Sequence, residues 1–336
     1  MKARKALKKM LTISVAFAVL MPFCACEKGE TRIMDAQTWE QSFSTGITEI
    51  RDTAQNRARY LENNMIMTEE GAFQSDNQNG VQGLYYIGEN GQTALLQKGY
   101  FANLQMQGEF LYAVDIGATH NDKPILYRFN LRDNTMCPFG DKIQYGYVFS
   151  DGHVLYVYNQ KVYYSDWENE NVTQLFEDGS AMTILGEDDR VLLVDKWQGN
   201  AFLFTQAEGL KTFWTINAEC CFSDLRDGVI YLGKREEIEF RLTAVTADGT
   251  VLLNDEPVPV GSIRTMKYGF RYYLLTSTQL KALERSSCDI ISDHRLSNGM
   301  HFICVDTNRG NIHCYLYLFD DRIYYNGVSY SLGVVP

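Results

Sequence analysis

The sequence predicts an all-β fold, a β-propeller of six or seven four-stranded blades that spans residues 67–336. Two observations lead to this fold class. From about Met67 onward, short bursts of Tyr, Phe, Val and Leu alternate with Asn, Asp and Gly, which is the composition of strands joined by hairpin turns. In the same region a hairpin unit recurs at intervals of about 34 to 42 residues, close to the length of one propeller blade.

The hairpin unit is clearest at 161–179, KVYYSDWENENVTQLFEDG, where a strand, a polar turn and a second strand end in Asp-Gly. Similar units begin at residues 83, 125, 201, 242, 279 and 313. Between them lies another recurrent strand, seen as FLYAVD at 110, VLYVYN at 154, VLLVDK at 191, VIYLGK at 229, RYYLLT at 271 and HFICVD at 301. Each unit therefore holds at least three strands, with room for a fourth. The first and last units look partial, which suggests that they close one blade jointly.

A β-sandwich or barrel is the alternative, because it also has strands about every eight to twelve residues. Such a fold gives no reason for the same group of strands to recur along the chain. One blade cannot bury both of its faces, so successive units must stack around an axis. The repeat therefore favours the propeller.

One unit also carries a family resemblance. Residues 163–167, Tyr-Tyr-Ser-Asp-Trp, resemble the Tyr-Trp-Thr-Asp (YWTD) repeat of propellers of the low-density-lipoprotein-receptor type, with Tyr164 in place of Trp and Ser165 in place of Thr. Residues 177–179, Glu-Asp-Gly, match the Leu-Asp-Gly turn of that family. The repeat region also resembles bacterial lipoprotein propellers of unknown function and TolB-like repeats. Because the tetrad is structural in that family, the resemblance implies a propeller fold and carries no information about activity.

The N-terminus predicts export and lipid attachment. MKARKALKKM is basic, and LTISVAFAVLMPF is an apolar run of about 13 residues, too short to span a bilayer. Cys26 follows Phe23, Cys24 and Ala25, which fits a bacterial lipobox. We expect residues 1–25 to be a lipoprotein signal peptide, with Cys26 lipidated and the protein held on the extracytoplasmic side of the cell membrane. An ordinary signal peptide and a retained N-terminal anchor are the alternatives. Residues 26–38 read as a tether, and 39–66 as an N-terminal segment with a short helix.

Charge and cysteine usage exclude several classes of function. The formal net charge is −11, and loss of the basic signal peptide makes it more negative still. A chain this acidic is a poor candidate for binding nucleic acid. The cysteines beyond Cys24 and Cys26 have no disulfide or zinc spacing, so we interpret them as core thiols and expect no metal or cofactor.

Polar residues end the recurrent second strand at one position in several units. Asp115, Asp195 and Asp306 close FLYAVD, VLLVD and FICVD, and Asn159 is the equivalent residue of a fourth unit. In a propeller these positions lie at one rim of the axial funnel, where several carboxylates could bind a metal ion or a cationic ligand such as an amine. The competing interpretation is that each side chain caps its own turn.

No catalytic residue is predicted. The sequence has no GxSxG motif, and residues 150–153, Ser-Asp-Gly-His, read as a hairpin turn and not as part of a triad. His301 and His313 lie on adjacent candidate strands, where sheet histidines are commoner than a metal pair. Trp167, Trp197 and Trp214 flank turns and are the aromatic residues to examine for exposure.

These observations favour a membrane-anchored envelope lipoprotein that acts as a non-enzymatic binding or assembly module through one propeller face. Its partner would be a protein, peptide or glycan of the cell envelope. The alternative is an enzyme, a hydrolase or lyase of envelope or dietary glycans, because propellers also carry such sites. The absence of a recognisable nucleophile, metal cluster or cofactor loop in the sequence favours the binding module.

Overall fold

The computed structural model describes part of the chain, and the architecture below refers to that part. The described ranges are 31–32, 43–45, 64–68, 71–88, 92–120, 123–140, 145–179, 181–236, 239–259, 270–309, 312–313, 316–318, 322–325 and 328–331. The predicted signal peptide and the lipid attachment site Cys26 lie outside these ranges. No helix in the described part is long and apolar enough to cross a bilayer.

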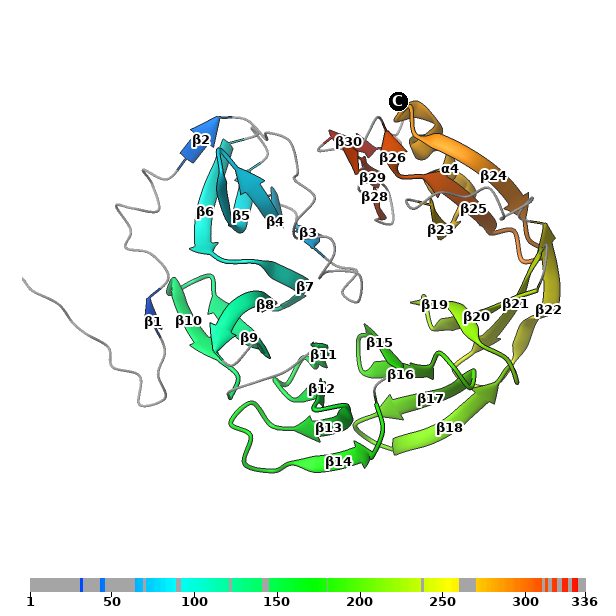
Figure 1. The fold of residues 1–336 in the computed structure, drawn as a ribbon, viewed down its shortest axis with the longest axis horizontal. Coiled ribbons are helices and arrows are strands. Elements are labelled where there is room, and N and C mark those ends of the chain that lie inside the picture. The colour runs from blue at the N-terminus through cyan, green and yellow to red at the C-terminus, as the bar shows by residue number, and fades with distance from the viewer. Residues whose placement is uncertain are drawn as a thin grey trace, which may run out of the picture.

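The protein is an all-β, six-bladed propeller built on a four-stranded blade, a plan that blades 1 to 5 follow in the described residues. Figure 1 shows the sheets arranged in chain order around a common centre. Blade 1 contains β3 (Met65–Met67), β4 (Gly71–Gln78), β5 (Val81–Gly88) and β6 (Gln92–Lys98), and blade 2 contains β7 (Phe101–Gln107), β8 (Phe110–His120), β9 (Lys123–Asn130) and β10 (Thr135–Pro138). Blade 3 contains β11 (Tyr145–Val148), β12 (Val154–Tyr158), β13 (Lys161–Ser165) and β14 (Thr173–Phe176), and blade 4 contains β15 (Met182–Glu187), β16 (Arg190–Asp195), β17 (Asn200–Thr205) and β18 (Gly209–Thr215). Blade 5 contains β19 (Cys220–Arg226), β20 (Val229–Arg235), β21 (Glu239–Thr246) and β22 (Val251–Pro259).

Blade 6 departs from this plan. Its described strands are β23 (Phe270–Leu275), β24 (Asp289–Arg295) and β25 (His301–Asp306), and β25 lies between the other two. Helix α4 (Ser277–Arg285) connects β23 to β24. A short ladder of β26 (Asn308–Arg309) and β27 (Ile312–His313) follows, and then a three-stranded sheet of β28 (Leu316–Leu318), β29 (Arg322–Tyr325) and β30 (Val328–Ser331).

In blades 2 to 5 the second strand is buried on both faces, which explains its run of apolar residues. In β16, the four residues Val191 to Val194 are all inaccessible to solvent, because neighbouring blades cover both sides of the sheet. Strands that are covered on one face only would alternate apolar and polar residues. The run of apolar residues is therefore a direct consequence of stacking around the axis.

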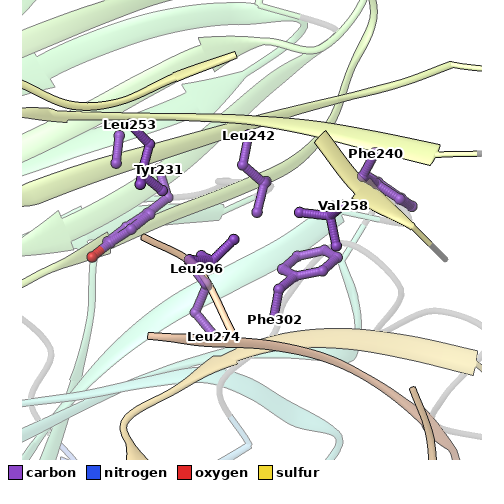
Figure 2. Close-up of a cluster of buried hydrophobic side chains, with 9 residues drawn as sticks. Tyr231, Phe240, Leu242, Leu253, Val258, Leu274, Leu296 and Phe302 are labelled. Atoms are coloured by element: carbon purple, nitrogen blue, oxygen red, sulfur yellow. The ribbon is translucent and has the colours of Figure 1, made fainter. Parts of the chain in front are cut away.

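The core lies between the blades. Figure 2 shows the contact between blades 5 and 6, in which Leu242 and Phe240 of β21 face Leu274 and Phe302 of blade 6. Similar clusters join each of the other neighbouring blades. Burial of this apolar surface is the main force that holds the separate sheets together.

The sheet β28–β30 closes the ring. Tyr325 of β29 belongs to a buried cluster with Leu283 of α4 and Val305 of blade 6, and Tyr324 packs with Met65 and Ile87 of blade 1. Figure 1 shows this sheet between blade 6 and blade 1. The expectation that the first and last units share one blade is wrong, because in the described residues they form separate sheets that meet through side chains.

The hairpin prediction holds for six of the seven units and fails at residue 279. Units at 83, 125, 161, 201 and 242 are the outer two strands of blades 1 to 5, and the unit at 313 includes β28 and β29. The stretch QLKALERSSCDIISD at 279 was expected to be two strands, but its first half is α4. Thr276 caps this helix, and Gln279, Leu280, Ala282 and Leu283 are its buried face. Strong helix formers with apolar residues three apart outweigh the resemblance to a strand.

Two smaller expectations also change. The strand RYYLLT at 271 is β23, an edge strand of its sheet, and not the equivalent of the second strands. In the segment 39–66, where a short helix was expected, the structure describes a strand β2 (Phe43–Thr45) that pairs with β6, and β3 begins at Met65. Another short strand, β1 (Thr31–Arg32), pairs with β10. Apart from Asn64, the other residues of both N-terminal segments lie outside the described ranges.

The cysteines of the described part form no disulfide with one another. Cys137, Cys220 and Cys304 are buried, and Cys221 does not bridge to its neighbour. Burial raises the pKa of the Cys220 thiol to about 11, so this thiol stays protonated at neutral pH. Cys314 lies outside the described ranges.

Candidate functional site

The predicted rim residues occupy equivalent positions in three blades. Asp115 ends the inner part of β8 opposite Phe101, Asp195 ends β16 opposite Met182, and Asp306 ends β25 opposite Phe270. In each blade the partner is the first residue, or the first paired residue, of the innermost strand. The three aspartates therefore lie at the same end of the propeller, which we call the aspartate rim.

Asn159 differs from the aspartates in its surroundings. It follows β12 and lies in the two-residue turn that leads to β13, with a positive φ of 48°. Asparagine tolerates this left-handed conformation better than most residues. Its place in the sequence is therefore explained by the turn, and it is exposed at the surface.

Asp115 binds the backbone of the loop that enters its own blade. Its Oδ1 accepts hydrogen bonds from the N–H groups of Tyr100 (3.2 Å) and Gly117 (2.9 Å). The carbonyl of Tyr100 in turn accepts from the N–H of Ile116 at 2.7 Å. A Cβ on Gly117 would lie 2.4 Å from Cδ2 of Tyr100, so the tyrosine ring rests on this glycine. Asp115, itself buried, thus fixes the position of an aromatic residue whose surface is 40% exposed.

Asp195 has the same role in blade 4. Its Oδ1 accepts from the N–H groups of Trp197 (2.9 Å) and Gln198 (3.1 Å), and its carbonyl accepts from Gly199 at 2.8 Å. Gly199 has a φ of 68°, and a Cβ there would lie 2.2 Å from the carbonyl oxygen of Ala218. Only glycine fits this turn. Trp197 is held at its tip with 70% of its surface exposed.

The turn around Trp197 is also tied to the loops on both sides. Lys196 donates its N–H to Ala181 at the start of blade 4 and accepts from Cys220 at the start of blade 5, at 3.1 and 2.7 Å. The carbonyl of Gly199 accepts from Ile216 at 3.0 Å. These bonds make the turn a rigid part of the scaffold.

The contacts of Asp115 and Asp195 are those of turn-capping residues. Within the described ranges, no three His, Cys, Asp or Glu side chains lie close enough together to hold a metal ion. Asp115 and Asp195 are thus placed to hold the exposed aromatic residues Tyr100 and Trp197. Of the tryptophans that the sequence singled out, Trp167 is buried between blades 2 and 3, Trp214 is half-buried, and Trp197 is exposed.

Tyr100 was missed by sequence reasoning. It lies in the loop between blades 1 and 2, and its exposure depends on Asp115, which is distant in the sequence. The available sequence signal was the pair Gly99-Tyr100 ahead of a strand, in which a glycine precedes an aromatic residue in a connecting loop. In the structure this glycine has a φ of 150°.

Comparison with known proteins supports the fold alone. No family model and no curated protein matches the sequence. Among solved structures, virginiamycin B lyase from Staphylococcus aureus is similar with a TM-score of 0.54 and 9% sequence identity, covering 84% of this chain and 95% of that one. A streptogramin B lyase is similar with a TM-score of 0.51 and 9% identity, covering 77% of this chain and 87% of that one. At this identity, the shared feature is the propeller.

Proposed function

We propose that this protein is an extracytoplasmic lipoprotein, anchored at Cys26, that acts as a binding or assembly module. It would bind a protein, peptide or glycan of the cell envelope through the aspartate rim, where Asp115, Asn159, Asp195 and Asp306 lie. The observation that carries this proposal is Trp197, exposed over 70% of its surface on a turn that Asp195 fixes.

Exposure of a large aromatic residue on a rigid turn suits recognition. An indole ring offers a large apolar face and a polar N–H, and it loses little conformational entropy when a partner covers it. The turn is already ordered by Asp195 and Gly199, so its ordering adds little to the cost of binding. Tyr100 repeats the arrangement in blade 2 with Asp115.

Site-specific photo-crosslinking in the producing cell tests this role and identifies the partner at the same time. Replacement of Trp197 by a benzophenone amino acid should give a defined adduct whose mass and chemistry identify a protein, peptide or glycan. The matched control is the same replacement at Val172, which is 45% exposed in the β13–β14 loop at the opposite end of the propeller. Equal adducts at both positions, or none at Trp197, would contradict the proposal.

Once a partner is captured, Trp197→Ala should weaken its binding by about 30-fold, the effect of losing a central aromatic contact. Val172→Ala should leave the affinity unchanged. Asp195→Asn should weaken binding less than Trp197→Ala, because an amide oxygen still accepts the hydrogen bonds from the turn.

The anchor is tested separately. Metabolic labelling with a fatty-acid analogue should mark the wild-type protein and place it in the membrane fraction. Cys26→Ala should abolish both. If Cys26→Ala is still labelled and membrane-bound, the anchor is elsewhere, and the proposal for the rim is unaffected.

A further inference from the structure

Blade 6 brings three polar side chains together at the end of the propeller opposite the aspartate rim. His301 begins β25, Ser277 is the first residue of α4, and Asp293 lies in β24. Ser277 Oγ lies 3.2 Å from His301 Nε2, and His301 Nδ1 lies 2.9 Å from Asp293 Oδ1. The imidazole ring is thus held at one nitrogen by a carboxylate and faces a hydroxyl with the other.

The irregular topology of blade 6 creates this arrangement. β25 is the middle strand, and His301 pairs directly with Leu275, the last residue of β23, so that Ser277 follows only two residues later. On the other side His301 pairs with Arg295, and Asp293 is two residues away on the same face of β24. The histidine therefore lies between the hydroxyl and the carboxylate because its strand lies between theirs.

The start of α4 adds hydrogen-bond donors beside Ser277. An α-helix leaves the N–H groups of its first turn without partners inside the helix. Here a capping box uses two of them: Gln279 N–H donates to Thr276 Oγ1 at 3.1 Å, and Thr276 N–H donates to Gln279 Oε1 at 3.0 Å. Among the described residues, the N–H groups of Ser277 and Thr278 have no acceptor, and they lie at the positive end of the helix.

A neighbouring blade fixes this helix start. Arg226 of blade 5 donates from Nη1 to the carbonyl of Leu274 at 2.7 Å and to Gln279 Oε1 at 3.3 Å. The same Gln279 belongs to the capping box, so the position of Ser277 is set from two directions. Such support is what a reacting group needs to keep its geometry.

A second histidine–aspartate pair provides an internal comparison. His153 Nδ1 lies 2.9 Å from Asp151 Oδ2 in blade 3, at the same distance as in the His301 pair. The other described contact of the His153 ring is the face of Tyr164, which stacks on it at 5.3 Å between centroids. His153 thus has the carboxylate but no described hydroxyl nucleophile, whereas His301 has both.

We propose that Ser277, His301 and Asp293 form a catalytic triad that hydrolyses short-chain acyl esters. Asp293 holds the proton of His301 on Nδ1, which leaves Nε2 free to take the proton of Ser277. Ser277 Oγ then attacks the ester carbonyl, and the N–H groups of Ser277 and Thr278 stabilise the negative oxygen. The carbon–oxygen bond to the alcohol breaks, and the alcohol leaves with the proton from His301.

Water completes the reaction. His301 Nε2 takes a proton from a water molecule while the oxygen of that water attacks the acyl carbon bound to Ser277. When the carboxylic acid leaves, His301 returns the proton to Ser277 Oγ. The net change is ester plus water to carboxylic acid plus alcohol, with no other reactant required. This chemistry differs from the glycan hydrolase or lyase considered from the sequence, since it acts on an acyl group.

The surroundings of the triad favour a short acyl group. Ser277 and Thr278 are exposed, and 40% of the Asp293 side chain is accessible. The residues at the helix start are polar, so a long acyl chain would gain little by lying across them. A short ester such as an acetyl group on a larger carrier fits an exposed site of this kind.

A fluorophosphonate probe tests the nucleophile directly on the purified full chain. The probe should phosphonylate the wild-type protein, with loss of fluoride, and peptide mass spectrometry should place the adduct on Ser277. Ser277→Ala should abolish it, and Asp293→Asn should slow labelling by about 100-fold or more. The matched control His153→Gln, which breaks the second histidine–aspartate pair, should label at the wild-type rate.

Hydrolysis of p-nitrophenyl acetate and p-nitrophenyl octanoate tests the substrate class. The acetate should be cleaved at a higher kcat/KM than the octanoate, and Ser277→Ala should reduce the rate to the uncatalysed background. Thermal melting checks that Ser277→Ala and Asp293→Asn remain folded. A wild-type protein that neither labels nor cleaves the acetate, or a labelled Ser277→Ala variant, would overturn the proposal. A preference for the octanoate would overturn the proposed substrate class.

Discussion

Blade 4 and blade 6 share a buried middle strand but differ in what surrounds it. In blade 4, a turn at Asp188 and Asp189 joins β15 to β16, and four strands lie in chain order. In blade 6, α4 replaces that turn, and β24 is added on the far side of β25. The regular blade places capping side chains at its rim. The irregular blade places a serine, a histidine and an aspartate together at its other end, so a departure from the repeat brings together side chains that the repeat keeps apart.

The largest expected effect is a loss of unfolding free energy when core leucines are truncated. It shows whether α4 belongs to the core as much as the regular strands do. Leu192 in β16 and Leu283 in α4 are both inaccessible to solvent. Leu192→Ala and Leu283→Ala should each lower the free energy of unfolding by about 3 kcal/mol, because each leaves a cavity in a packed core. Urea denaturation measures both. Leu252→Ala, at a position 42% exposed in β22, should change the free energy by less than about 0.5 kcal/mol.

A much smaller loss for Leu283→Ala than for Leu192→Ala would break the comparison. It would mean that α4 lies on the propeller without stabilising it, and that the position of Ser277 depends on the capping box alone.

An intermediate effect concerns alkaline stability. Burial raises the pKa of Tyr147, between blades 3 and 4, to about 12, and burial likewise raises that of Tyr272 in blade 6 to about 12. The ordinary pKa of tyrosine is about 10, so between pH 10 and 12 the unfolded chain loses these protons while the folded chain keeps them. The free energy of unfolding should therefore fall as the pH rises through this window.

Tyr147→Phe and Tyr272→Phe should each make that decline less steep, by up to about 2 kcal/mol across the window. Tyr147→Phe also loses the hydrogen bond from its hydroxyl to the carbonyl of Asp188 at 3.1 Å, which lowers stability at all pH values. Chemical denaturation at several pH values separates the two effects. An unchanged slope in Tyr147→Phe would show that this phenol is not kept protonated by burial.

The smallest expected effect concerns the start of α4. Thr276→Ala removes the oxygen that accepts from Gln279 N–H and should cost about 1 kcal/mol. Thr276→Ser keeps that oxygen and should stay close to wild type, and Thr278→Ala at the exposed next-but-one position should do so as well. Equal losses for Thr276→Ala and Thr278→Ala would argue against the capping box as the feature that fixes this junction.

Much of the fold could be predicted because each regular blade repeats local information. An apolar strand, a polar turn and a second strand form a hairpin whose partners are close in sequence, so the unit at 161–179 reads correctly without its surroundings. The same pattern predicted two strands for the unit at 279, where the structure has helix α4. Its signals for a helix were present, since Thr276 precedes Gln279 by three residues and Leu280 and Leu283 are on one face.

The two candidate sites differ in how much of each could be predicted from the sequence. The aspartate rim was found because Asp115, Asp195 and Asp306 end the same strand of successive repeats, although the turns that they cap could not be read from spacing. The Ser277–His301–Asp293 group could not be found, because chain order suggests that β24 lies next to β23. Only the insertion of β25 between them puts His301 within reach of both partners.

The closing sheet has a consequence for the order of events during folding. Tyr324 in β29 packs against Met65, Ala72 and Ile87 in blade 1, so this junction joins residues roughly 250 positions apart in the chain. Contacts this distant form slowly, since a long loop must close before they contribute. Blade 1 therefore keeps an uncovered apolar face throughout synthesis, until β29 is in place. A chaperone that shields that face would contact Met65 and Ile87 until Tyr324 covers them.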